Sequence, residues 1–355
     1  MRSTAALRLR NLVSSRAHRY KLVAIRPRRY STRRPHILTG LRPSIHPFSP
    51  LKNLDTLQPH TYRSKMSDTE LDAAAAAEVY AAEALAGLQA TLLNDTETQS
   101  RARELTQNIH EIKERMTAAA ASATAASSKR SNEGPLLIAV SKLKPAIDIL
   151  ALHIDGQEHF GENYVQELSK KQPILPNTIH WHFIGSLQSS AISKLARLPN
   201  LYAVHSVDSA KKAVALNRLR PDNLPPVRVF IQVNTSGEDS KSGLAPSSED
   251  LYTAVATIRK ECPKLILEGL MTIGAIARSQ AAKEGEENED FITLVNVAEE
   301  LEARIEKDDG EKVTLKLSMG MSDDFENAIA LGADYVRVGS SIFGARPAKA
   351  DATIL

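Results

Sequence analysis

Residues 136–164, LLIAVSKLKPAIDILALHIDGQEHFGENY, contain the repeating unit that decides the fold. An apolar run from Leu136 to Val140 ends in Ser141-Lys142, and a polar break with Pro145 follows. A helical pattern of apolar residues comes next, before a second short run that closes on residues 160–163. Strand, helix, strand is the unit from which parallel sheets are built.

Lys142 lies where the first of these strands ends. In a closed barrel of such units, the carboxyl ends of the strands form the rim that carries the chemistry. Burial lowers the pKa of an amine, and a neutral amine can attack an aldehyde to give an imine. A solvated lysine after a strand is the simpler interpretation, and position alone favours it.

The rest of the chain repeats the unit. Strands are predicted at 136–141, 159–163, 179–185, 201–207, 227–234, 267–274, 314–320 and 335–339, with helical patterns between them. From Arg101 to the end there are about 255 residues, a typical size for one (β/α)8 TIM barrel. An open doubly wound sheet is the alternative, because strand order cannot be read from the sequence.

Two helices are predicted before the barrel. In residues 101–120 an apolar stripe recurs at helical spacing (Leu105, Ile109, Ile112, Met116). The Ala-rich residues 71–93 favour a peripheral helix with few large side chains to bury. We therefore divide the chain into an extension at 1–65, an Ala-rich helical extension at 66–100 and a barrel at 101–355. Residues 121–134 are predicted to be a linker, and the acidic run 283–290 a solvated loop before a helix.

The N-terminal segment differs in charge from the rest. Residues 1–65 hold 15 basic and 1 acidic residue, whereas the remainder holds 30 basic and 41 acidic residues. Such Arg-rich starts are typical of transit peptides, with mitochondria the first choice. A nucleic-acid-binding arm is a weaker alternative, and translation from Met66 would give a cytoplasmic protein.

The acidic body argues against nucleic acid as a partner. The single cysteine, Cys262, excludes an internal disulfide and fits a reducing compartment. No apolar run is long enough to span a membrane, so no membrane association is expected.

Two loops near the end predict an anion site. Residues 318–324, SMGMSDD, follow the seventh strand, and residues 339–344, GSSIFG, follow the eighth. Small residues let backbone N–H groups approach a phosphate closely, and barrel enzymes commonly hold phosphates at these two loops. An ordinary turn with a helix cap at Ser322 remains the alternative.

Arg337 directly precedes the second loop, so its side chain is predicted to enter the barrel mouth, where a buried guanidinium needs a partner. With Lys142 opposite, one ligand uses all three features: pyridoxal phosphate. Its aldehyde would meet the lysine, its phosphate the Gly/Ser loops and its ring nitrogen the arginine.

Several motifs now resemble one family. AVSK (139–142), FGENYVQE (160–167), WHFIGSLQ (181–188), GLMTIG (269–274), LSMGMSDDFENAI (317–329) and RVGSSIFGAR (337–346) are similar to the pyridoxal phosphate homeostasis proteins. The resemblance covers about residues 100–347. It implies the barrel of fold-type III pyridoxal phosphate enzymes, related to the alanine racemase barrel.

The resemblance also implies roles for individual residues. Lys142 matches the lysine that forms the Schiff base, Arg337 the arginine facing the pyridine nitrogen, and Asn163 a residue lining the cofactor pocket. The residues that match phosphate-binding segments are Ser318, Met319, Gly320, Gly339 and Ser340. His182 and Phe183 match rim positions where packing is expected. Where the family continues LQ-S-N-K, this chain reads Leu187-Gln188-Ser189-Ser190-Ala191, so an amide and a positive charge are lost.

Two functions fit this resemblance. A non-catalytic binder would buffer pyridoxal phosphate or hand it to apoenzymes, and a racemase or decarboxylase would use the same barrel. Catalysis needs a second acid or base, which in the racemases comes from an added β-domain. The chain stops 11 residues after Gly344, leaving no room for that domain, so the binder is expected, as a monomer.

Overall fold

The computed structural model describes residues 68–122, 134–238, 241–275, 278 and 288–355. The chain divides into two compact units, residues 1–79 and 80–355, and helix α2 (Asp68–Asn94) begins in the first of them. The extension at 1–65 and most of the linker at 121–134 lie outside the described residues. The barrel and the helices that cover it belong to residues 80–355.

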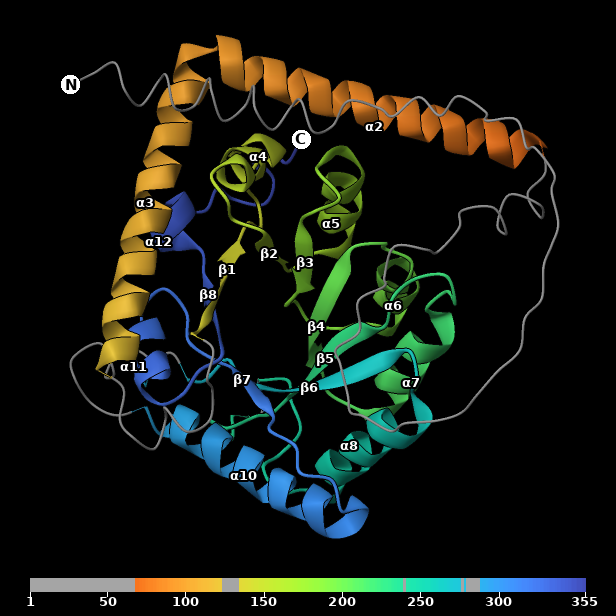
Figure 1. The fold of residues 1–355 in the computed structure, drawn as a ribbon, viewed down its shortest axis with the longest axis vertical. Helices are drawn as coiled ribbons and strands as arrows, with labels where there is room; N and C mark the ends of the chain where they lie inside the picture. Colours follow the sequence, from red (N-terminus) through yellow and green to blue (C-terminus); the bar gives the residue numbers. More distant parts are fainter. Residues whose placement is uncertain (1–67, 123–133, 239–240, 276–277, 279–287) are drawn as a thin grey trace, which may run out of the picture. The chain divides into compact units, whose positions relative to one another are not determined.

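The centre of this unit is a closed parallel barrel in which each strand pairs with the next, and β1 pairs with β8 (Figure 1). The strands are β1 (Leu136–Val140), β2 (His159–Glu162), β3 (His180–Phe183), β4 (Leu201–Val207), β5 (Val227–Gln232), β6 (Leu265–Met271), β7 (Lys316–Ser318) and β8 (Tyr335–Val338). The predicted (β/α)8 fold is therefore confirmed, and the open sheet is excluded.

Helices surround the barrel (Figure 1). They are α3 (Thr96–Ala121), α4 (Ala146–Ile154), α5 (Val165–Lys171), α6 (Ser189–Ala196), α7 (Ala210–Leu219), α8 (Glu249–Glu261), α10 (Glu289–Asp309), α11 (Phe325–Ala330) and α12 (Ser340–Phe343). A short 3₁₀ turn, Gln172–Ile174, follows α5. The buried apolar faces of these helices and the outward faces of the strands form one continuous core.

Helix α3 covers the seam between the last and first strands. Its predicted apolar stripe, Leu105, Ile109, Ile112 and Met116, is buried, and the helix packs against α4, α11 and α12. Because α12 has only four residues, α3 supplies the cover that a helix after β8 gives in a regular barrel. A segment that precedes the first strand thus completes the outer ring.

Strand β7 ends at Ser318, before the predicted residue 320, because the chain turns sharply at Gly320. This glycine has φ +89°, and a Cβ there would lie 2.6 Å from the Cβ of Ala328 on α11. Only glycine fits such a left-handed position against a helix. The turn starts the loop that leads to α11.

The expectation of a solvated loop at 283–290 is wrong at its end. Asp290 belongs to the first turn of α10 and is fully buried. Its carboxylate accepts from the backbone N–H of Ala275 at 2.7 Å and from Arg278 at 2.6 Å. Residues 283–287 lie outside the described part of the chain. Within the residues that the structure describes, no helix is long and apolar enough to cross a membrane.

Candidate functional site

Lys142 lies two residues past the end of β1, at the carboxyl end of the barrel, and is half-buried. Burial lowers the pKa of its amine, and the nearby Arg346 lowers it further, while Glu162 and Glu167 act in the opposite direction. A larger share of this amine is therefore neutral near pH 7 than in a solvated lysine, as nucleophilic attack requires.

A buried ion-pair network holds the loop that carries Lys142. Lys171 on α5 donates to Glu162 at 2.8 Å and to the carbonyl of Ser141 at 2.9 Å, and the Ser141 hydroxyl donates to Glu162 at 2.7 Å. Burial raises the pKa of Glu162 to about 7, against the opposing effect of Lys171. The network fixes the backbone immediately before Lys142.

The other side of the same loop is held by Glu167 on α5. Its carboxylate accepts from the backbone N–H of Leu143 at 2.7 Å. Leu143 has φ +60°, a left-handed conformation that costs a branched side chain about 1–3 kcal/mol. The strained residue next to Lys142 is thus stabilised from α5, which restricts where the lysine side chain can point.

The two loops predicted to hold an anion do meet. The N–H of Gly339 donates to the Ser322 hydroxyl at 3.2 Å, and the N–H of Arg337 donates to the carbonyl of Gly320 at 3.1 Å. Ser322 therefore ties the loops together and does not cap α11, whose N-cap is Asp324.

The candidate phosphate-binding residues differ in whether their N–H groups are still available to donate a hydrogen bond to an anion. The N–H of Met319 is used by the carbonyl of Tyr335 at 3.1 Å, and the Met319 side chain is fully buried. The N–H of Gly339 is used by Ser322. Ser340, by contrast, is exposed at the first position of α12, where backbone N–H groups have no acceptor within the helix.

Arg337 is buried inside the barrel, on β8 beside β1, where it pairs with Ile138. It is therefore on the strand next to that of Lys142, not opposite it as predicted. Its Nη1 donates to the hydroxyl of Ser318 at 2.8 Å and its Nη2 to the carbonyl of Thr272 at 2.8 Å. Ser318 thus lies beside the guanidinium in the barrel interior.

Asn163 follows β2 and lines a cavity of about 420 Å³ between the loops after β2 and β3. Its buried Oδ1 has no hydrogen-bond partner among the described residues. Ser190 and Ala191, where the chain departs from the family motif, line the same cavity. The departure therefore changes the cavity beside Asn163 and leaves the Lys142 loop untouched.

His182 corrects one expectation: it lies inside the barrel and is fully buried, not at the rim. Phe183 is a core residue, as expected. Two histidines that were not predicted as site residues bond His182, namely His159 and His205, each at 2.9 Å. Their signal was a histidine in three successive strands at positions where barrels usually carry aliphatic side chains.

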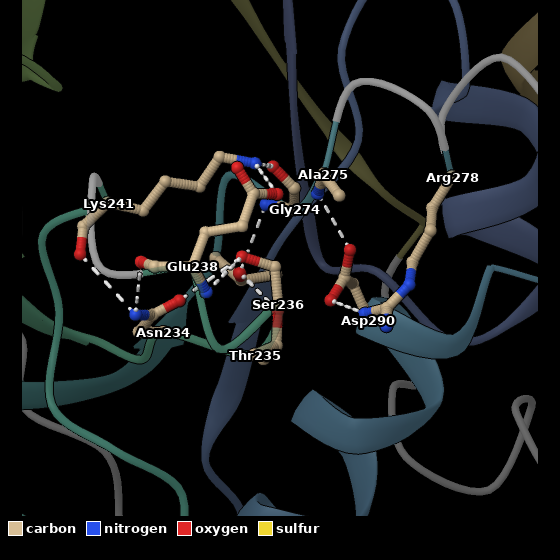
Figure 2. Close-up of polar contacts among 10 residues, drawn as sticks. Asn234, Thr235, Ser236, Glu238, Lys241, Gly274, Ala275, Arg278 and Asp290 are labelled. Carbon is tan, nitrogen blue, oxygen red and sulfur yellow. Dashed lines mark hydrogen bonds and ion pairs between the residues drawn. The ribbon is translucent and has the colours of Figure 1, made fainter.

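A further part of the rim was missed, the loops after β5 and β6 (Figure 2). Lys241 donates to Glu238 at 2.9 Å and to the carbonyl of Gly274 at 2.6 Å, so the two loops are joined. Asn234 also closes the β5 loop, donating to the carbonyl of Glu238 at 3.0 Å. The polar run NTSGEDSKSG after the fifth strand was the available signal.

Comparison with known proteins first defines the class. Residues 100–347 match the family model of the alanine racemase N-terminal domain. A solved structure from Bifidobacterium adolescentis is 32% identical with a TM-score of 0.56, and the match covers 69% of this chain and 96% of that one. PipY of Synechococcus elongatus, solved with PLP bound, is 28% identical with a TM-score of 0.52, over 68% and 100% of the two chains.

Curated relatives then identify the family within this class of proteins. Pyridoxal phosphate homeostasis proteins of Schizosaccharomyces pombe and Homo sapiens are 45% and 42% identical to this chain. Each match covers 60% of this chain, and 85% and 77% of the two relatives. The chain belongs to the family of pyridoxal phosphate homeostasis proteins, built on the alanine racemase N-terminal domain.

Proposed function

We propose that this chain binds pyridoxal 5′-phosphate, holds it as a Schiff base on Lys142, and buffers or delivers it within the cell. The observation that carries the proposal is the half-buried Lys142 amine at the end of β1, one strand away from the buried Arg337. The PLP bound to PipY and the names of the curated relatives support the same ligand.

The residues at the barrel mouth fit the three parts of this cofactor. The Lys142 amine, whose pKa is lowered by burial, would add to the aldehyde with loss of water. Ser340, with the N–H groups at the first turn of α12, would receive the phosphate beside Gly339 and the tight turn at Gly320. Arg337 would face the ring nitrogen. The unpartnered Oδ1 of Asn163 offers one more acceptor beside the pocket.

Arg337 favours a binder over an enzyme. Burial lowers its pKa to about 10, so the guanidinium still keeps its proton at neutral pH. An arginine beside the ring nitrogen leaves that nitrogen unprotonated, and the bound cofactor is then a weak electron sink. A racemase or decarboxylase on this barrel, the alternative, would need a second acid or base beside the bound cofactor.

The partners and location follow from the same proposal. Apoenzymes that depend on pyridoxal phosphate would be the recipients, and neither nucleic acid nor a membrane is needed. The protein would act as a monomer. The basic segment before Met66 would direct the full chain to mitochondria, whereas a chain started at Met66 would stay in the cytoplasm.

Borohydride reduction followed by peptide mass mapping tests the function. The full chain mixed with pyridoxal phosphate should show an imine absorbance and a reduced adduct on Lys142. Lys142→Ala should lose both while its melting temperature stays close to wild type. Lys170→Ala is the matched control, because Lys170 is an exposed lysine in the last turn of α5. An adduct that survives in Lys142→Ala contradicts the assignment.

The non-catalytic part needs its own measurement. The loaded protein should neither racemise nor decarboxylate amino acids above the rate of free pyridoxal phosphate. Turnover that disappears in Lys142→Ala would establish the racemase or decarboxylase instead.

A further inference from the structure

A chain of hydrogen bonds crosses the inside of the barrel. Starting at the amino end of β2, His159 Nδ1 lies 2.9 Å from His182 Nε2, and His182 Nδ1 lies 2.9 Å from His205 Nε2. His205 Nδ1 lies 2.9 Å from the hydroxyl of Ser318, which accepts from Arg337 at 2.8 Å. We call these five residues the histidine chain.

The histidine chain connects the two ends of the barrel. Arg337 lies near the carboxyl end of β8, whereas His159 is the first residue of β2 and lines a cavity of about 480 Å³ at the amino end. Between them, His182 and His205 are fully buried.

The direction of the bonds follows from the arginine. A guanidinium can only donate, so the Ser318 oxygen accepts from Arg337. In the part of the chain that the structure describes, the remaining neighbour of that hydroxyl is His205, so Ser318 donates to His205 Nδ1. The proton of His205 is then on Nε2, which donates to His182 Nδ1. By the same reasoning, His182 and His159 also carry their protons on Nε2.

All hydrogen bonds of the histidine chain therefore run in one direction, and in each of them the donor is the residue on the Arg337 side. Bonds in such a series polarise one another and strengthen each link. Burial lowers the pKa of His182 and of His205, and Arg337 lowers that of His205 further. Neutral imidazoles, each donating once and accepting once, are what this series requires.

Charged and titratable groups from the neighbouring strands surround the histidine chain. Arg228 on β5 lies 4.3 Å from the ring centre of Tyr202 on β4 and 3.3 Å from Glu268 on β6. Tyr335 on β8 donates to Glu268 at 3.0 Å. His180 on β3 lies beside His159, with ring centres 4.8 Å apart. Arg228 is paired with a carboxylate, yet it still lowers the pKa of His159 and His182. The direction of the hydrogen bonds is set by Arg337, which can only donate.

Burying three imidazoles where barrels normally pack aliphatic side chains is costly, and only a fully bonded series offsets that cost. We propose that His205, His182 and His159 are positioning residues for Arg337: the histidine chain fixes the guanidinium, through Ser318, in the orientation that faces the ring nitrogen of the cofactor. This inference rests on the proposed function.

Ligand titration of the full-length protein tests it. His182→Phe keeps the ring volume and removes two hydrogen bonds. It should weaken binding of pyridoxal phosphate about fivefold or more, as loss of a hydrogen bond does, and weaken unphosphorylated pyridoxal by the same factor because both share the ring nitrogen. His180→Phe is the matched control and should stay within about twofold of wild type.

A second measurement needs no ligand. Nitrogen-15 NMR of the histidine rings in the cofactor-free protein should show the Nε2–H form at all three histidines of the histidine chain at pH 7. His159→Phe, at the half-buried end, should shift the signals of His205, two hydrogen bonds away, whereas His180→Phe should not. This variant keeps the test decisive if His182→Phe does not fold.

The outcomes separate the two proposals. If the wild-type protein binds no pyridoxal phosphate, the proposed function fails and this inference fails with it. If the wild type binds but His182→Phe binds equally well, or His180→Phe loses as much, the inference alone is overturned. An Nδ1–H signal at His205 in the wild type also overturns it.

Discussion

Ser340 places an exposed hydroxyl at the start of α12, where the neighbouring N–H groups lack helical acceptors. Ser340→Ala should weaken pyridoxal phosphate binding by about 1.5–3 kcal/mol, because a hydrogen bond to a charged phosphate is lost. Unphosphorylated pyridoxal should bind both forms equally poorly. Titration with both ligands checks this. An equal loss for both ligands would mean that the substitution damages the pocket in general.

His159 should contribute to acid sensitivity. Burial lowers its pKa from 6.5 to about 4, with His180 and Arg228 adding to the effect. Between these two values the unfolded chain holds a proton that the folded chain lacks, so stability is lost as the pH falls through this window. One such group changes the free energy of unfolding by about 1.4 kcal/mol per pH unit.

His159→Phe removes that group. Its melting temperature should therefore fall less steeply than that of the wild type between pH 6.5 and 4, whatever the offset between the two proteins at pH 7. Thermal melts at half-unit steps of pH measure the two slopes. Parallel curves would show that His159 keeps a nearly normal pKa in the fold.

The position of a site residue could be predicted from the sequence only where neighbouring residues along the chain determine it. Lys142 follows directly from the end of an apolar run, and the two Gly/Ser loops stand where strands end. The partners of Arg337 could not be predicted, because its bonds to Ser318 and Thr272 depend on the inward faces of other strands. His159 and His205 were missed for the same reason.

At the scale of elements, side chains of α3 donate hydrogen bonds to the last backbone carbonyls of α12. Asn108 donates to the carbonyl of Ile342 at 2.9 Å, and Arg101 donates to that of Phe343 at 2.7 Å. The last backbone carbonyls of a helix have no N–H donors within the helix, so these two donating side chains fix the loop that follows β8. A helix from before the barrel thereby supports the proposed phosphate site.

Asn108→Ala should therefore weaken pyridoxal phosphate binding about fivefold and lower the melting temperature, since a part-buried hydrogen bond contributes about 1 kcal/mol. Pyridoxal without phosphate should be affected less. Gln107→Ala is the matched control, because its exposed side chain bonds Glu111 on the same helix. If both variants bind alike, α12 holds its position without α3.

Helix α3 also shows what a pattern can and cannot predict. The spacing of its apolar residues predicted the helix and the residues that it buries. Where the helix docks is decided by the gap that the four-residue α12 leaves between α4 and α11. That gap is a property of the closed barrel and leaves no trace in residues 101–120 themselves.

For the molecule as a whole, strand count and spacing predicted the barrel, while its closure rests on the pairing of β1 with β8 across about 200 residues, Leu136 with Tyr335. The remaining expectation at this scale concerns the basic segment at the start. It carries 15 basic residues and 1 acidic residue, against 30 and 41 in the rest of the chain. Such a basic block has too little apolar surface to offset the conformational entropy that it would lose on folding.

A protein that starts at Met66 should therefore bind pyridoxal phosphate and melt like the full chain, yet lose import into mitochondria. This start retains every described helix, because α2 begins at Asp68. A chain that starts after Ala121 is the control: it lacks α3 with the buried Leu105 and Ile109 and should fail to fold. Melting curves of the purified forms, with microscopy of tagged forms in cells, measure both effects. A Met66 form that melts several degrees lower would show that residues 1–65 pack on the barrel, whereas equal stability with both forms in the cytoplasm would refute the targeting role alone.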